Sequence, residues 1–110
     1  MSGPVGVVRV SSKRPFSVFV LEAKQILRKQ ETVELHGVGE AITYSVRVAD
    51  VLCSNGYTEL QKFETTSIEE NDYSGNPSRR AKVIVVLRRS RDFARLDAEY
   101  EQQRESRVSS

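Results

Sequence analysis

The sequence predicts a single small α/β domain in which strands and helices alternate before a final pair of strands. Apolar residues recur at helical spacing in two segments, and they alternate or cluster at strand spacing in four others. The chain of 110 residues is 38% hydrophobic, which suits one modest core. We expect the order β-α-β-α-β-β with a long hairpin arm over residues 1–90, followed by a charged helical tail over residues 91–110.

The first strand and the first helix are expected on either side of a basic turn. A valine-rich segment from Val5 to Val10 predicts the strand. Pro15 opens the helix because its fixed φ and missing N–H suit the first helical position. An amphipathic helix is predicted over residues 15–29, since apolar side chains recur every three or four residues. These apolar residues are Phe16, Phe19, Val20, Ala23, Ile26 and Leu27.

A second strand and a second helix follow around a glycine turn. Residues 32–35 alternate between polar and apolar side chains, which indicates a strand. Two glycines, Gly37 and Gly39, then turn the chain into a helix over residues 40–55, and Gly56 follows as a C-terminal stop.

This second helix carries two apolar stripes, although a small sheet can cover only one of them. The first stripe is Ile42, Val46, Ala49 and Cys53, and the second is Tyr44, Val48, Val51 and Leu52. Surplus apolar surface on a small domain predicts a second chain. We place the dimer interface on the second stripe, together with the apolar last strand.

The last two strands are expected to form a long hairpin. Residues 58–68 and 81–87 read as strands, and the second is apolar enough for the centre of a sheet. The segment 69–80 between them contains turn residues and predicts an exposed tip, with an acidic ascending side and a basic descending side. Beyond Ser90, widely spaced apolar residues in a charged segment predict a fraying terminal helix whose last residues are disordered.

Several kinds of chemistry lack the residues they need. One histidine and one cysteine cannot supply a zinc site, and no Ser-His-acid or paired-carboxylate spacing is present. No apolar run approaches the ~20 residues that span a bilayer. The single Cys53 excludes an internal disulfide and fits a reducing compartment. We therefore expect a protein that is not an enzyme, with no metal, no cofactor and no membrane partner.

Basic side chains gather at two exposed places. Lys13 and Arg14 precede the first helix, where the helix dipole usually favours acids. With two neighbouring serines and open backbone amides they form a site for an anion such as phosphate, although a solvated basic turn is the competing interpretation. Arg79, Arg80 and Lys82 descend from the hairpin tip. Stacking aromatics are scarce, which favours backbone contact over base reading.

The order of elements, with Lys-Arg-Pro before the first helix, resembles the Alba family of chromatin and RNA-binding proteins. Three segments carry the resemblance in the family's order, namely residues 13–23, 33–42 and 79–85. Many archaeal members have arginines around the glycine of the turn, where this chain has Val38 and Glu40. The sequence is therefore more similar to eukaryotic members, which often bind RNA as well as DNA.

The resemblance implies a homodimer, or a heterodimer with a related Alba protein, that binds DNA and RNA. It implies contacts from Lys13 and Arg14 in the body and from Arg79, Arg80 and Lys82 in the arm. The expected function is non-enzymatic, largely sequence-independent binding in chromatin organisation or mRNA and translation regulation, in the nucleus and cytoplasm. The alternative is a structural RNA-binding subunit of a ribonuclease P/MRP-like particle.

Overall fold

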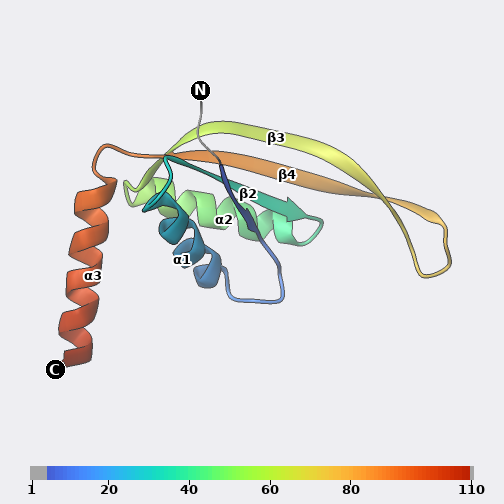
Figure 1. The fold of residues 1–110 in the computed structure, drawn as a ribbon. Helices are drawn as coiled ribbons and strands as arrows, with labels where there is room; N and C mark the ends of the chain where they lie inside the picture. The colour runs from blue at the N-terminus through green and yellow to red at the C-terminus, as the bar shows by residue number, and fades with distance from the viewer. Residues whose placement is uncertain (1–4, 110) are drawn as a thin grey trace.

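The computed structural model describes residues 5–109, and its element order confirms the predicted fold class. A long β3–β4 hairpin leaves the body on one side, and a helix follows it at the C-terminal end (Figure 1). The elements are β1 (Gly6–Arg9), α1 (Phe16–Leu27), β2 (Thr32–Val38), α2 (Ala41–Ser54), β3 (Thr58–Asn71), β4 (Pro77–Arg89) and α3 (Phe93–Ser109).

The four strands form one mixed sheet in the order β1-β2-β4-β3. β1 pairs with β2 in parallel, and the other two pairs are antiparallel. Helices α1 and α2 lie on one face of the sheet, while the opposite face has no helix over it in the described part of the chain (Figure 1). We call that opposite face the open face.

The core lies between the sheet and the two helices. The alternate residues Val83, Val85 and Leu87 of β4 are at most 1% exposed, which confirms that this apolar strand lies at the centre of the sheet. The helical positions predicted for α1 are also confirmed, because Phe19, Val20, Ala23 and Leu27 are buried while Phe16 and Ile26 pack against the core.

The turn between β2 and α2 is tighter than the sequence suggests. Gly37 belongs to β2, where a Cβ would collide with the Ser45 hydroxyl and stand 2.8 Å from the Ala41 carbonyl oxygen. Gly37 therefore lets α2 approach the strand closely, and Gly39 alone, with φ at +59°, makes the turn.

The hairpin strands are longer than predicted. β3 and β4 remain paired from Thr58 opposite Arg89 to Asn71 opposite Pro77, so most of the expected loop is strand. The turn closes over residues 72–76, where an Asp72 carboxylate oxygen accepts hydrogen bonds from the Ser74 and Asn76 amides, each 2.9 Å long. The paired part beyond the body is called the arm.

The prediction that the second stripe of α2 forms the dimer interface is wrong for two of its four residues. Val48 and Leu52 are completely buried in the core of their own chain, so they are not accessible to a second chain. Tyr44 and Val51 are half-buried and pack against the same core. The large apolar residue of α2 that is exposed to solvent is Val46, at 43%, and it belongs to the other stripe.

A buried serine explains why the inner face of α2 matches neither of the two predicted apolar stripes. The inner face of α2 consists of Ala41, Ser45, Val48 and Leu52. Ser45 is completely buried, and its hydroxyl donates to the Ala41 carbonyl oxygen at 3.0 Å. Because this bond satisfies the hydroxyl within the helix, a polar residue can occupy the core stripe.

Helix α3 docks on the body through its first turns. Phe93 is 3% exposed, and its ring lies edge-on to Tyr57 with centroids 6.0 Å apart. This packing crosses the boundary at residue 90 that composition had suggested. The helix continues to Ser109, while the expected disorder of the last residues falls partly on Ser110, outside the described residues.

Lys24 of α1 and Arg28, the residue that follows this helix, hold α3 in place. Arg28 donates two hydrogen bonds to the Asp97 carboxylate, at 2.7 and 3.0 Å, and a third to Glu101 at 3.0 Å. The Lys24 ammonium lies 4.1 Å from the ring centroid of Tyr57 and 3.9 Å from that of Tyr100. We call this cluster of Lys24, Arg28, Tyr57, Asp97, Tyr100 and Glu101 the α3 latch.

Candidate nucleic-acid interface

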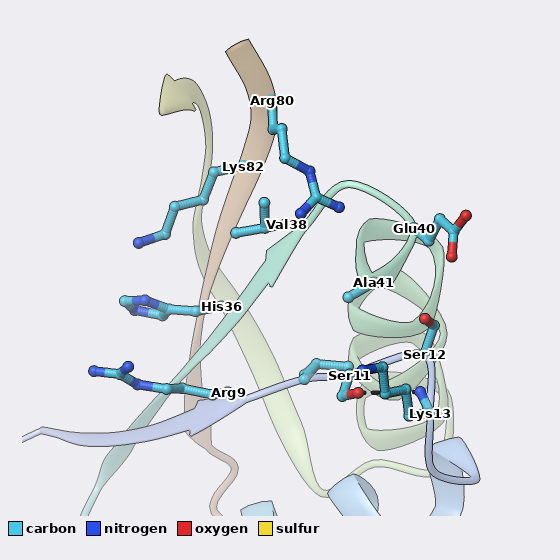
Figure 2. Close-up of a pocket in the computed structure, with 11 residues that line it drawn as sticks. Arg9, Ser11, Ser12, Lys13, His36, Val38, Glu40, Ala41, Arg80 and Lys82 are labelled. Atoms are coloured by element: carbon cyan, nitrogen blue, oxygen red, sulfur yellow. Dashed lines mark hydrogen bonds between the residues drawn. The ribbon is translucent and has the colours of Figure 1, made fainter. Parts of the chain in front are cut away.

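An open pocket of about 530 Å³ lies where the arm leaves the body. The end of β1, the loop after it, the β2–α2 turn and the arm side of β4 surround it (Figure 2). Its lining residues are Arg9, Val10, Ser11, Ser12, Lys13, His36, Val38, Glu40, Ala41, Arg80 and Lys82.

Backbone hydrogen bonds fix the walls of this pocket. The Val10 amide donates to the His36 carbonyl oxygen at 2.8 Å, which ties the start of the loop to β2. The Lys13 amide donates to the Ser11 hydroxyl at 3.0 Å and so folds the loop back on itself. On the opposite side, the Gly39 amide donates to the Ala81 carbonyl oxygen at 2.9 Å. The loop, the turn and the arm are thus held together.

The polar side chains of the pocket form two groups. Arg9, His36 and Lys82 project together from the open face of the sheet, whereas Lys13 and Arg80 lie on the side of the β2–α2 turn (Figure 2). Strand register explains the first group, because Arg9 is opposite His36. Lys82 is opposite Val38, two residues further along β2.

The cations differ in whether a carboxylate neutralises them. Arg80 is 3.6 Å from Glu70 across the arm. Arg9, Lys13 and Lys82 have no ion pair within residues 5–109. Their charge is available to an external anion, and we call them the unpaired cations.

The structure brings three of the five predicted contact residues together in this pocket: Lys13, Arg80 and Lys82. Arg14 does not line it, because its guanidinium lies 3.5 Å from Glu22 and 5.7 Å from the Phe19 ring centroid. Arg79 also lies outside the pocket, on the arm.

Two basic residues of the pocket, Arg9 and His36, were not among the predicted contacts. Arg9 lies between the buried residues Val8 and Val10, so strand alternation directs it away from the core. That alternation was a usable signal. His36 lies on β2, and its Nε2 is 2.8 Å from a Glu34 carboxylate oxygen.

The described residues contain no cluster of metal-ligating side chains. None of the helices among them is long and apolar enough to cross a membrane. The polar groups that line the pocket are four cationic side chains, two serine hydroxyls, the His36 imidazole and the Glu40 carboxylate. The cations and hydroxyls among them can hold an anion by charge and hydrogen bonds.

The fold and this pocket define a small α/β domain that presents a cationic cleft at the base of a hairpin arm. The sequence model of the Alba family matches residues 6–70, and the chain belongs to that family. Alba proteins bind nucleic acids and are generally not catalytic.

The chain is also similar to individual proteins in sequence or in fold. The uncharacterized protein At2g34160 of Arabidopsis thaliana is 30% identical over 96 residues, which cover 86% of this chain and 74% of that protein. The structure of ALBA1 from Trypanosoma brucei matches with a TM-score of 0.73 and 26% identity, covering 98% of this chain and 87% of the other. Alba from Thermoplasma volcanium shares the fold, with a TM-score of 0.64 and 17% identity over 78% of this chain and all of that one.

Proposed function

We propose that the protein is a non-enzymatic DNA- and RNA-binding dimer that contacts the phosphate backbone with little regard to sequence. It would act in chromatin organisation or in mRNA and translation regulation, in the nucleus and cytoplasm. The observation that carries this proposal is that three unpaired cations line one open pocket, Arg9 and Lys82 from the open face of the sheet and Lys13 from the side of the β2–α2 turn.

The shape of the pocket favours a polymer as its ligand. It is open to solvent, and Arg80 and Lys82 line it where the arm begins, so a chain of phosphates has room to pass between the body and the arm. Backbone phosphates provide most of the affinity in sequence-independent binding, because each neutralised phosphate releases counterions. Three unpaired cations in each protomer would provide up to six such contacts in a dimer.

This proposal predicts a steep dependence on salt. Fluorescence anisotropy of a labelled duplex between 50 and 200 mM salt should give a log–log slope of roughly −5 for six contacts. Scrambled duplexes should bind with equal affinity, since backbone contacts carry no sequence information. A slope near zero, or a strong preference for one sequence, would contradict backbone-dominated binding.

The proposed dimer interface combines the first stripe of α2 with two exposed residues of β3. Leu60 and Phe63 are 56% and 50% exposed, and their register opposite Leu87 and Val85 puts them on the helix-covered side of the sheet. Val46 of α2 is 43% exposed on the same side. A second copy or a related Alba protein would remove these apolar surfaces from water.

Two substitutions on α2 separate this interface from the core. Val46→Asp should leave the chain folded and monomeric, because the new charge would be buried only in the dimer. Val48→Asp should prevent folding, since Val48 is completely buried within one chain. Light scattering and circular dichroism give both readouts. A dimer that survives Val46→Asp would exclude this face.

The same interface suits the alternative role as a structural subunit of a ribonuclease P/MRP-like particle. Affinity purification from cells would distinguish the two functions. A fixed, different protein partner with one structured RNA would favour the particle, and a self-dimer with heterogeneous nucleic acid would favour the first function.

A further inference from the structure

The open face of the sheet beside the pocket presents apolar side chains to solvent. Val7 of β1 is 45% exposed, and Val38, Ile84 and Val86 are half-buried. These four residues lie on β1, β2 and β4, the three neighbouring strands that also carry Arg9, His36 and Lys82.

His36 lies near the centre of this face. Register puts Arg9, His36 and Ile84 in one row across β1, β2 and β4. Neighbouring strands are about 5 Å apart, so the imidazole has Arg9 on one side and Ile84 on the other. Lys82 occupies the next row towards the arm (Figure 2).

The imidazole is held in place and is still partly accessible. Its Nε2 lies 2.8 Å from Glu34, and the His36 side chain is 21% exposed. A ring fixed by one hydrogen bond loses little freedom when a second ring stacks on it. Apolar neighbours can cover the rest of a planar group.

The unpaired cations determine which occupant suits this face. Arg9 and Lys82 carry positive charge with no carboxylate partner in residues 5–109, and they flank the ring on two sides. A nucleotide has complementary chemistry, since it presents a planar base between two phosphates. Only an unpaired base can place its flat face on a side chain, because a duplex buries that face in its own stack.

We propose that the open face binds single-stranded nucleic acid, with an unpaired base stacked on His36 and the flanking phosphates held by Arg9 and Lys82. This inference rests on the proposed function and adds a ligand class to it, since duplexes would use the pocket and single strands would use the pocket and the open face together.

The test compares His36→Ala, His36→Phe and the wild-type protein on two fluorescein-labelled probes, a 12-nucleotide oligo-U and a 12-base-pair duplex. Loss of one stacking contact should weaken oligo-U binding about 5- to 10-fold in His36→Ala. His36→Phe should restore it, because phenylalanine keeps the aromatic face. Duplex affinity should fall by less than oligo-U affinity in His36→Ala, because the phosphate contacts of Arg9, Lys13 and Lys82 are retained. Oligo-dU in parallel shows whether the 2′-hydroxyl contributes.

Thr32→Ala is the matched control, because Thr32 lies on the same strand and the same face, four residues from His36. It should leave both affinities unchanged. Photocrosslinking of wild-type protein to 4-thiouridine oligo-U gives a readout that needs no variant. The tryptic peptide spanning residues 30–47, which contains His36, should carry the crosslink.

Equal effects of His36→Ala on both probes, no effect on either, or crosslinks confined to other peptides would overturn the inference. Each of these results leaves the proposed function standing while the wild-type protein binds both probes. Failure of the wild-type protein to bind either probe would instead refute the proposed function.

Discussion

Two clusters of cations in this protein have opposite surroundings. In the α3 latch, the Lys24 ammonium lies against the rings of Tyr57 and Tyr100, and Arg28 pairs with the carboxylates of Asp97 and Glu101. In the pocket, Arg9, Lys13 and Lys82 have no ion pair within residues 5–109. The partners of a cation, and not its charge, therefore determine whether it stabilises the fold or remains available to a ligand.

The electrostatics of the latch reflect this difference. The Asp97 hydrogen bonds raise the pKa of Arg28, so its charge is secure. Burial lowers the pKa of Lys24, while Tyr100 and Asp97 oppose that shift. Burial also raises the pKa of the Tyr57 hydroxyl, which stays neutral beside the ammonium.

The largest effect is expected from Arg28→Ala. This substitution leaves Asp97, which is 8% exposed, without its two hydrogen bonds. A buried group without a partner costs about 2 kcal/mol, so the free energy of unfolding should fall by that amount. Urea denaturation measures it, and nucleic-acid affinity should remain unchanged. Arg28→Lys should be intermediate because it keeps the charge without the planar fork. An unchanged unfolding free energy would mean that the latch is only a surface contact.

The double substitution Lys13→Ala with Lys82→Ala tests the other cluster. Affinity for duplex at 100 mM salt should fall roughly 10-fold, since each solvent-exposed ionic contact that is lost contributes at most about 1 kcal/mol. The salt slope should become shallower by about two units per protomer. The unfolding free energy should change by less than about 0.5 kcal/mol because neither residue lies in the core. An equal loss of stability and affinity would remove the distinction between the two clusters.

Lys24→Met sharpens the comparison through pH. Because the folded pKa of Lys24 is below the unfolded value of 10.5, the unfolded chain holds more protons at this residue as pH approaches 10. The Lys24 contribution to stability therefore increases with pH in the wild-type protein, and the substitution should abolish that increase. Unfolding free energies of both proteins from pH 7 to 10 measure the difference. Parallel pH profiles would show that Lys24 titrates alike in both states.

The smallest effect is expected from Arg14→Ala. Arg14 is exposed and pairs with Glu22 at 3.5 Å, outside the pocket. Exposed pairs contribute about 0–1 kcal/mol, so stability should barely change, and duplex affinity should stay within about twofold. Lys13→Ala alone should weaken binding more. Equal duplex affinities of Arg14→Ala and Lys13→Ala would show that the ion pair of Arg14 does not make it less important for binding than Lys13.

Sequence periodicity predicted most of the fold. The buried positions of α1 could be predicted from the helical spacing of its apolar residues, and the central position of β4 from its run of apolar residues. The docking of α3 did not, because Arg28 and Asp97 are 69 residues apart and each has the polar character of a solvated helix face. The burial of Ser45 could not be predicted for a related reason, because its hydrogen-bond partner is a backbone carbonyl and not another side chain.

The candidate site could be predicted in the same uneven way. Lys13, Arg80 and Lys82 flank a loop and a hairpin, where exposed cations are conspicuous in sequence. Arg9 and His36 join them only through the pairing of β1 with β2, a register that no local pattern specifies. The separation of Arg14 from Lys13 likewise depends on an ion pair eight residues away.

The arm and the core share one continuous strand, β4. Its N-terminal part lies in the solvent-exposed arm, and its C-terminal part contributes buried residues to the core. The reach of the arm can therefore change without repacking the domain. One residue added to each strand at the tip would lengthen the arm by about 3.4 Å and leave the pocket in place. Because the length of the arm can change independently of the core, related chains could contact different lengths of nucleic acid with the same body.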